Sequence, residues 1–415
     1  MNRFEIQANI ENPKELERLY QANKSGFKKE FNLLYPELKD TQLAAFWNER
    51  LNFEGPEISW GSSKELTFVV IASIIAGCIA KLPDVLHINL DSFFQRNIGF
   101  IVLPILTFYF AWKNNLKPGR ILAMTLAFVI SLFFINLLPG NNKSDTWILA
   151  CIHLPLFLWT ILGMSFVGEN LKSNHLRIDF LRFNGDLVVL SALMVIAGGV
   201  MTGITIGLFS VIGIKVEHFY QEYVIVFGLS AVPIVGTYVT RMNPQLVNKV
   251  SPVIAKIFSP LVLITLVVYL VAIFFSGKDP YNDRDFLMIF NFLLIGVMAI
   301  ILFAVAESSK KESNQSGNII LLALSVVTSI VNGIALSAIL FRISEWGITP
   351  NRLAVLGANI LMLINLLMVT YRLYQNRSKK SGMTEVENAI ARFLPVYGIW
   401  TVIVTFIFPL IFQFK

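Results

Sequence analysis

The sequence predicts an all-α fold: a polytopic transmembrane helical bundle of about 11 spans behind a small N-terminal cytoplasmic helical segment. Three observations predict it. Hydrophobic residues make up 55% of the 415-residue chain and charged residues only 15%, whereas soluble domains carry about 25% charged residues. The mean hydropathy is +0.64. The apolar residues also gather into runs long enough to cross a bilayer. This composition excludes a secreted or cytosolic enzyme and a disordered chain.

Residues 1–64 form the first predicted domain, a hydrophilic tail and linker, and residues 65–415 form the transmembrane domain. The tail lacks the basic start and immediate apolar stretch of a signal peptide. It begins a helix at Asn12, which suits the N-cap, followed by Pro13 at the first helical position and Glu15 at the third. The tail is therefore expected to be helical.

The tail pattern predicts a helical hairpin with one apolar stripe. Apolar residues recur at helical spacing until Pro36, which is expected to end the first arm. The second arm carries Phe46 and Trp47 on one face and leads into a linker at Gly55-Pro56. A hairpin of this size is marginal alone. Its stripe is therefore expected to dock on the membrane domain, the lipid surface or a protein partner.

Eleven apolar runs follow the tail, each close to the length that a membrane helix needs. They span residues 66–83, 97–112, 119–138, 147–166, 186–211, 220–240, 252–275, 285–305, 318–341, 351–371 and 391–412. The connecting loops are too short to hold a soluble catalytic domain. The spans therefore contain most of what this chain can use for function.

Loop charge predicts the orientation. With the N-terminus inside, sixteen basic residues fall at the inner loops and nine at the outer segments, and the tail adds nine more inside. Cytoplasmic loops carry the excess of Lys and Arg. We therefore expect a cytoplasmic N-terminus and a periplasmic C-terminus. The net charge of +7 reflects this orientation and does not indicate a nucleic-acid partner.

Small residues in the spans are expected to serve packing. Gly199, Gly203 and Gly207 repeat every four residues, a spacing that lets membrane helices approach closely. Cys78 and Cys151 lie inside apolar runs and are interpreted as small core residues. None of these positions indicates a disulfide or a metal site.

Ionisable residues inside membrane spans are rare and are candidates for function. By the predicted topology, one side of the membrane holds a candidate outer vestibule made of His153, Glu222, Arg342, Glu345 and Arg352. Three alternatives stay open. The arginines and Glu345 would form an interfacial ion-pair network. Glu222 would be solvated, and His153 would donate to a carbonyl within the bundle.

Four asparagines lie deeper in the last spans and form a candidate polar path. They are Asn291, Asn332, Asn359 and Asn365. Interhelical hydrogen bonds are the ordinary role of such residues. A polar route through the bundle is the alternative, because three of the last four spans carry them.

Several chemistries have no motif in this chain. The sequence holds no G-x-x-x-x-G-K-[ST] loop, no G-x-G-x-x-G helix start, no H-E-x-x-H, no C-x-x-C and no G-x-S-x-G. With only four histidines, a His-rich metal site is not expected. The sequence therefore assigns no catalytic residue, no metal site and no cofactor.

Two regions resemble a known family. The segment 343–352, which opens a long apolar helix, is similar to a segment of the bacterial polytopic proteins of domain-of-unknown-function family 4153. The tail segments 12–20, 35–37 and 46–51 resemble the N-terminal region of members from Bacteroidota. The resemblance implies a bacterial inner membrane. It brings no activity and no site residues.

Three functions remain open. The helix count, the asparagines and the candidate vestibule favour a permease or lipid-handling transporter, which requires a cavity reaching the middle of the membrane. The lack of an energy-coupling motif favours a non-catalytic membrane subunit or sensor that binds a protein partner through the tail. An intramembrane enzyme acting on a lipid-linked substrate would use His153 or Glu222 as base and Arg342 or Arg352 to hold a phosphate. Membrane lipids are expected partners in each case.

Overall fold

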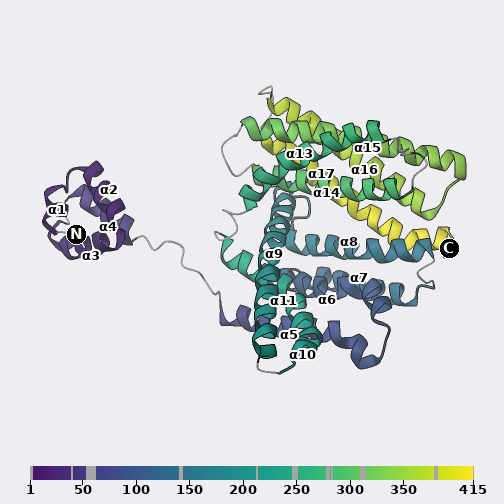
Figure 1. Ribbon diagram of the computed structural model, residues 1–415, viewed down its shortest axis with the longest axis horizontal. Coiled ribbons are helices and arrows are strands. Elements are labelled where there is room, and N and C mark those ends of the chain that lie inside the picture. Colours follow the sequence, from purple (N-terminus) through teal and green to yellow (C-terminus); the bar gives the residue numbers. More distant parts are fainter. Residues whose placement is uncertain are drawn as a thin grey trace. The chain divides into compact units, whose positions relative to one another are not determined.

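The computed structural model of the chain (Figure 1) describes residues 3–38, 41–52, 62–139, 144–211, 214–244, 251–276, 281, 284–308, 315–377 and 382–414. Its contacts divide the chain into two units, Met1–Ser59 and Trp60–Lys415, near the predicted boundary after residue 64. The predicted linker at Gly55-Pro56 lies outside the described residues.

The described residues of the N-terminal unit form four helices where a hairpin was predicted. They are α1 (Arg3–Ala8), α2 (Pro13–Ala22), α3 (Lys24–Leu38) and α4 (Gln42–Asn52). Asn12 caps α2 as predicted, because its side chain accepts a hydrogen bond of 3.3 Å from the backbone N–H of Glu15. The prediction that Pro36 ends a helix was wrong: α3 includes it and ends at Leu38. A proline in the last turn removes one backbone hydrogen bond, which α3 tolerates.

These four helices enclose a core of their own. Its buried residues are Ile6, Leu16, Phe27, Phe31, Leu34, Ala44, Trp47 and Leu51. The Trp47 ring centroid lies 5.1 Å from that of Phe27 and 5.5 Å from that of Tyr20. Phe46, which was predicted to share a face with Trp47, is exposed. Most of the predicted apolar stripe is therefore buried within this unit and needs no external surface to cover it.

The second unit holds the apolar helices. They are α5 (Ser63–Leu86), α6 (Leu90–Lys113), α7 (Pro118–Leu137), α8 (Asp145–Val167), α9 (Asn174–Val211), α10 (Glu217–Phe219), η1 (Tyr220–Val224), α11 (Ile225–Met242), α13 (Ser251–Ser276), α14 (Arg284–Ser308), α15 (Gln315–Trp346), α16 (Pro350–Arg377), α17 (Met383–Val402), η2 (Ile403–Ile407) and α18 (Phe408–Ile411). The segments η1 and η2 are π-helical turns that continue directly into α11 and α18.

The protein is an all-α, multi-pass membrane protein. Within the described residues, ten helices are long and apolar enough to cross a membrane, and α13 contributes the shorter apolar stretch Ala255–Val271. Each of the eleven predicted spans falls on one of these helices or helix runs. Many apolar side chains on them are exposed, as lipid-facing side chains would be, for example Ile71, Ile130 and Phe292.

Polar residues directly before the apolar runs determine where several helices begin. Ser62 caps α5 and exchanges hydrogen bonds with Glu65 in a capping box. Asn89 accepts a hydrogen bond of 2.9 Å from the backbone N–H of Ser92 at the start of α6. Ser144 accepts one of 3.3 Å from that of Trp147 at the start of α8. The starts of α6 and α8 lie on the same side of the unit, because Arg96 near the start of α6 contacts the Trp147 ring near the start of α8.

Two packing predictions differ from the structure. Cys151 is buried as predicted, but Cys78 is exposed on α5. A Cβ added at Gly199, Gly203 or Gly207 would meet no described atom within 4 Å. The helix contact predicted for these glycines is therefore not formed within the described chain, where the side chains in the second half of α9 are mostly exposed.

Candidate functional site

The turn between α15 and α16 forms as its sequence predicts. Gly347 has a φ of +75°, in the left-handed region that glycine favours. The Thr349 hydroxyl accepts a hydrogen bond of 3.3 Å from the backbone N–H of Arg352, and Pro350 begins α16. This turn lets α15 and α16 pack side by side along the top of Figure 1.

Asn332 and Asn365 lie at similar depths on this helix pair. Asn332 precedes Arg342 by ten residues, and Asn365 follows Arg352 by thirteen. These separations correspond to about 15 Å and about 20 Å along a helix. Half of the hydrocarbon core of a bilayer is about 15 Å. A bilayer boundary at the two arginines would place both amides near the middle of the membrane.

The side-chain amides of the four asparagines differ in their hydrogen bonding. The side chains of Asn332, Asn359 and Asn365 are each 0% exposed. Asn359 Nδ2 donates a hydrogen bond of 2.8 Å to Asn291 Oδ1, which joins α16 to α14. The amide nitrogen and oxygen of Asn332 and of Asn365 have no hydrogen-bond partner among the described residues. Two of the four therefore play the ordinary interhelical role, and two keep unused hydrogen-bonding capacity.

Buried hydroxyl groups extend the polar face of α15. Ser325 and Thr328 are fully buried, and with Asn332 they follow the spacing of three and four residues that places side chains on one helix face. The Ser325 hydroxyl donates to the carbonyl oxygen of Leu322, at 2.9 Å, and the Thr328 hydroxyl to that of Leu324, at 2.6 Å. Both hydroxyl oxygens keep acceptor capacity. The sequence analysis did not identify this polar face, although the spacing of Ser325, Thr328 and Asn332 is visible in the sequence.

The two arginines of the candidate vestibule come together around Trp346. The guanidinium carbons of Arg342 and Arg352 lie 5.0 Å and 5.7 Å from a Trp346 ring centroid. Arg352 Nη1 donates to the carbonyl oxygens of Trp346 and Gly347, at 2.8 Å and 2.7 Å. Glu345 is exposed and forms no ion pair with either arginine in the described part of the chain. The predicted three-residue ion-pair network is therefore absent there, and Arg352 caps the end of α15.

Glu222 belongs to a different part of the unit. Its carboxylate oxygen Oε2 lies 2.6 Å from Lys81 Nζ, and Lys81 also pairs with Asp84. This contact joins η1 to α5. The neighbouring α10 lies at the bottom of Figure 1, whereas α15 and α16 lie at the top. Within the described residues, Glu222 thus pairs with Lys81, and no contact joins it to Arg342 or Arg352.

His153 makes a contact within its own helix. Its Nδ1 lies 2.9 Å from the carbonyl oxygen of Leu149, so the ring donates to that oxygen. This matches the alternative in which His153 serves the bundle. No described contact joins His153 to Glu222 or to the arginines. The described residues thus give no contact that supports an enzyme with a Glu222 base.

A charged cluster that the sequence did not predict lies where α9, α14 and α17 meet. Arg182 Nη1 lies 2.5 Å from Asp179 Oδ1, its Nε 3.5 Å from Glu307 Oε1, and its Nη2 3.7 Å from Glu387 Oε1. Arg182 Nη2 also donates to the carbonyl oxygen of Ala306, at 2.6 Å. The side chains of Arg182, Glu307 and Glu387 are only 12%, 3% and 13% exposed.

The spacing of Asp179 and Arg182 was the one local signal for this cluster, since residues three apart share a helix face. Glu307 and Glu387 are far away in sequence, so their approach depends on the tertiary fold. The arrangement is a buried ion-pair network holding three helices together. Within the described residues, no group of three or more His, Cys, Asp or Glu side chains is arranged to hold a metal ion.

Comparison with known proteins gives no identification. No family model matches the chain, and no curated protein and no solved structure matches it either. The resemblance of segment 343–352 and of the tail to family 4153 therefore stays a prediction.

Proposed function

We propose that this integral membrane protein is a permease for a small neutral polar solute, with Asn332 and Asn365 in its path. One observation carries the proposal: both amides lie within apolar spans, are fully buried and lack hydrogen-bond partners among the described residues. A buried polar group without a partner costs about 1–3 kcal/mol. Polar groups at this depth in a membrane protein are candidates for function for that reason.

The chemistry of the site favours a neutral cargo. An asparagine side chain both donates and accepts hydrogen bonds and carries no formal charge. Two such groups on facing helices, with the buried hydroxyls of Ser325 and Thr328 on the same face of α15, match a solute rich in hydroxyl or amide groups. A lipid-handling transporter, the other form of this hypothesis, would need an apolar channel beside the amides.

Transport requires α15 or α16 to move. The amides are fully buried, and a cavity of about 390 Å³ in this structure lies between α6 and α8, away from them. A solute therefore reaches Asn332 and Asn365 only when the packed pair opens. Alternating opening toward the two sides is the usual behaviour of transporters with a site near the middle of the membrane.

Transport by the reconstituted full chain tests the proposal. Vesicles loaded with a mixture of neutral sugars, polyols and amides are sampled over time, and the retained solutes are measured by mass spectrometry. We expect faster loss of at least one solute than from protein-free vesicles. Asn332→Leu and Asn365→Leu should slow that loss by about tenfold, the effect of one or two lost hydrogen bonds.

Asn388→Leu is the matched control, because Asn388 bonds to Asn174 at 3.0 Å, away from the candidate path. It should transport like the wild type. Wild-type vesicles that release no solute faster than protein-free vesicles would contradict the permease. If Asn332→Leu and Asn365→Leu both transport at the wild-type rate, the protein is still a permease, but these two residues do not line its path.

We also propose the bacterial inner membrane as the location, with the N-terminus cytoplasmic and the C-terminus periplasmic. The family resemblance and the excess of basic residues at the predicted inner loops support it. Reporter enzymes fused after residue 415, one active only in the cytoplasm and one only in the periplasm, test the orientation. Activity of the cytoplasmic reporter would overturn it.

A second candidate is a membrane subunit or sensor that binds a protein partner through the tail. Leu33 and Phe46 favour it, since they are 55% and 58% exposed although their unit has a core of its own. Native mass spectrometry after gentle extraction distinguishes the two functions. A fixed-ratio complex that is lost when residues 1–55 are deleted supports the subunit, and a chain that stays alone supports the permease.

A further inference from the structure

Tyr397 of α17 carries a buried hydroxyl group that no described contact of the fold uses. Its side chain is partly exposed, but the hydroxyl oxygen is buried and has no hydrogen-bond partner among the described residues. The ring packs edge-on against that of Phe393, with 5.2 Å between the ring centroids. Buried polar groups of native proteins are rarely left unpaired, and each exception needs a reason. The Tyr397 hydroxyl is in this respect like the amides of Asn332 and Asn365.

Two contacts fix the register between α16 and α17. A Cβ added at Gly357 would collide with the Trp400 ring, so this ring fills the space that the glycine leaves on α16. Towards the other end of α16, Asn376 Nδ2 lies 3.7 Å from Met383 Sδ at the start of α17. The two helices are therefore antiparallel neighbours.

This register places Tyr397 beside the asparagines of α16. Tyr397 precedes Trp400 by three residues, so it is level with residues 360–362 of α16. Along the helix axis, that level is about 2–5 Å from Asn359 and about 5–8 Å from Asn365.

Tyr397 and the unpaired amides also share one apolar core. Tyr397 packs against a core cluster that includes Met362 of α16 and Ala335 of α15. Asn365 follows Met362 by three residues. Asn332 precedes Ala335 by three residues. Because residues three apart share a helix face, the two amides and the Tyr397 hydroxyl lie on sides of three helices that meet at the same core.

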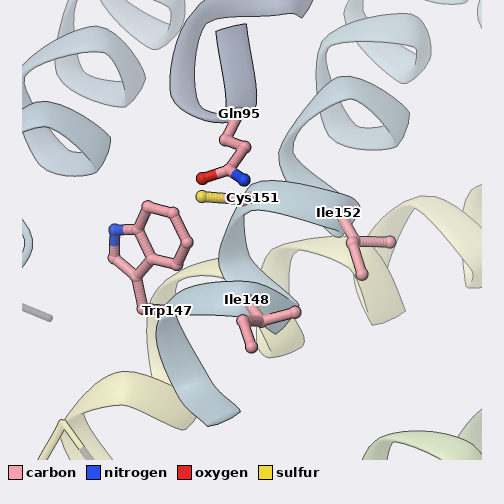
Figure 2. Close-up of a pocket in the computed structure, with 5 residues that line it drawn as sticks. All are labelled: Gln95, Trp147, Ile148, Cys151 and Ile152. Carbon is pink, nitrogen blue, oxygen red and sulfur yellow. The ribbon is translucent and has the colours of Figure 1, made fainter. Parts of the chain in front are cut away.

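The cavity between α6 and α8 is separate from this core. Its lining residues, shown in Figure 2, are Gln95, Trp147, Ile148, Cys151 and Ile152. Tyr397 lies on α17 and its hydroxyl oxygen is buried. A solute therefore reaches this hydroxyl, like the amides, only when the helices move apart.

We propose that Tyr397 is a third solute-binding residue and that α17 lines the path together with α15 and α16. The role of Tyr397 rests on the permease function proposed above. Its hydroxyl donates a hydrogen bond to an oxygen of the solute, while Asn332 and Asn365 bind other polar groups of the same molecule. Three uncharged groups on three helices match a solute with at least three hydrogen-bonding groups. A sugar or a polyol meets this requirement, and a small amide does not.

Transport by the reconstituted full chain tests this role. Vesicles are loaded with glucose, mannitol and acetamide at several concentrations, and the loss of each solute is followed by mass spectrometry. We expect glucose or mannitol to leave faster than from protein-free vesicles. Tyr397→Phe removes only the hydroxyl and should raise the half-saturating concentration about tenfold, the effect of one lost hydrogen bond. Loss of acetamide alone would overturn the three-group site.

Tyr109→Phe is the matched control. Tyr109 of α6 is 2% exposed, and its hydroxyl also has no hydrogen-bond partner among the described residues. This variant should transport like the wild type. If Tyr397→Phe also transports like the wild type, or if both variants are impaired equally, Tyr397 does not bind the solute and the permease is unaffected. If the wild-type chain transports none of the three solutes, the permease and the role of Tyr397 are both contradicted.

Thermal unfolding in a mild detergent gives a measurement that needs no transport. Because neither hydroxyl has a described partner, Tyr397→Phe and Tyr109→Phe should not lower the unfolding midpoint. A fall for Tyr397→Phe alone would show that its hydroxyl is paired in the folded protein, and this would overturn the assignment.

Discussion

Two buried polar clusters in the membrane unit differ in how they are satisfied. The cluster of α9, α14 and α17 surrounds one arginine with three carboxylates, and Arg182 contacts each of them within 3.7 Å. The amides of Asn332 and Asn365 on α15 and α16 are buried more completely, yet they have no hydrogen-bond partners among the described residues.

This difference distinguishes buried polar groups that stabilise the fold from buried polar groups that are available to bind something else. Charges buried in a protein are tolerated when they are paired, so the Arg182 cluster fits a contact that fastens three helices. Buried polar groups of native proteins are rarely left unpaired, and those that are need a reason. Exchange of hydrogen bonds with a passing solute is the reason that we propose for Asn332 and Asn365.

Removal of the central charge should have the largest effect. Arg182→Ala leaves Asp179, Glu307 and Glu387 without their shared cation, and breaking a buried ion pair costs about 3–5 kcal/mol. We expect a clear drop in the midpoint of thermal unfolding of the purified protein in a mild detergent.

Arg372→Ala is the matched control for this prediction. Arg372 Nη2 lies 3.9 Å from Glu385 Oε2, but the two side chains are 38% and 47% exposed. Exposed pairs contribute about 0–1 kcal/mol. If both alanine variants lower the midpoint equally, the Arg182 cluster is not the fastening contact described above.

Replacement of an unpaired amide should change stability in the opposite direction. Asn332→Leu substitutes an apolar side chain of similar size for a buried amide without partners. Its removal should raise the free energy of unfolding by about 1–2 kcal/mol, measured by the same unfolding assay. The same variant should lose transport. A loss of stability comparable with that of Arg182→Ala would show that Asn332 is paired in the folded protein.

Replacement of Asn359 should lower the stability of the protein by a smaller amount. Asn359→Leu removes the hydrogen bond of 2.8 Å to Asn291 and with it one link between α16 and α14. Interhelical hydrogen bonds in membrane proteins contribute about 0.6 kcal/mol on average and at most about 1.7 kcal/mol. A modest fall of the unfolding midpoint is expected, and a rise would place Asn359 with the unpaired amides.

The sequence predicted the helices much better than the contacts between them. Each of the eleven predicted runs falls on a helix, and ten described helices are long and apolar enough to cross a membrane. Local rules placed the cap at Asn12 and the turn at Gly347 and Thr349, because these depend on neighbours in the chain. Whether Glu222 meets Arg342 or Lys81 depends on helix order in the bundle, which periodicity does not encode. Glu307 and Glu387 joined Arg182 for the same reason without any sequence signal.

The tail shows the same limit at smaller scale. The apolar spacing correctly indicated helices, but a hairpin with an uncovered stripe was expected. Instead, four helices pack around Trp47. The first arm is divided into α2 and α3 before Lys24, and α1 adds a further helix to the core. The number of helices that share a core is a tertiary property, and the helical period alone does not reveal it.

The smallest effect is expected where polar groups are half exposed. Glu222→Gln removes the ion pair with Lys81 Nζ, but Glu222 is 43% exposed and Lys81 keeps Asp84 as a partner. The free energy of unfolding should fall by no more than about 1 kcal/mol, and salt should reduce the difference, because exposed pairs are screened. Transport should continue. If the Glu222→Gln protein is stable but does not transport, Glu222 in η1 takes part in transport. The unpaired amides of α15 and α16 would then not be sufficient for the path.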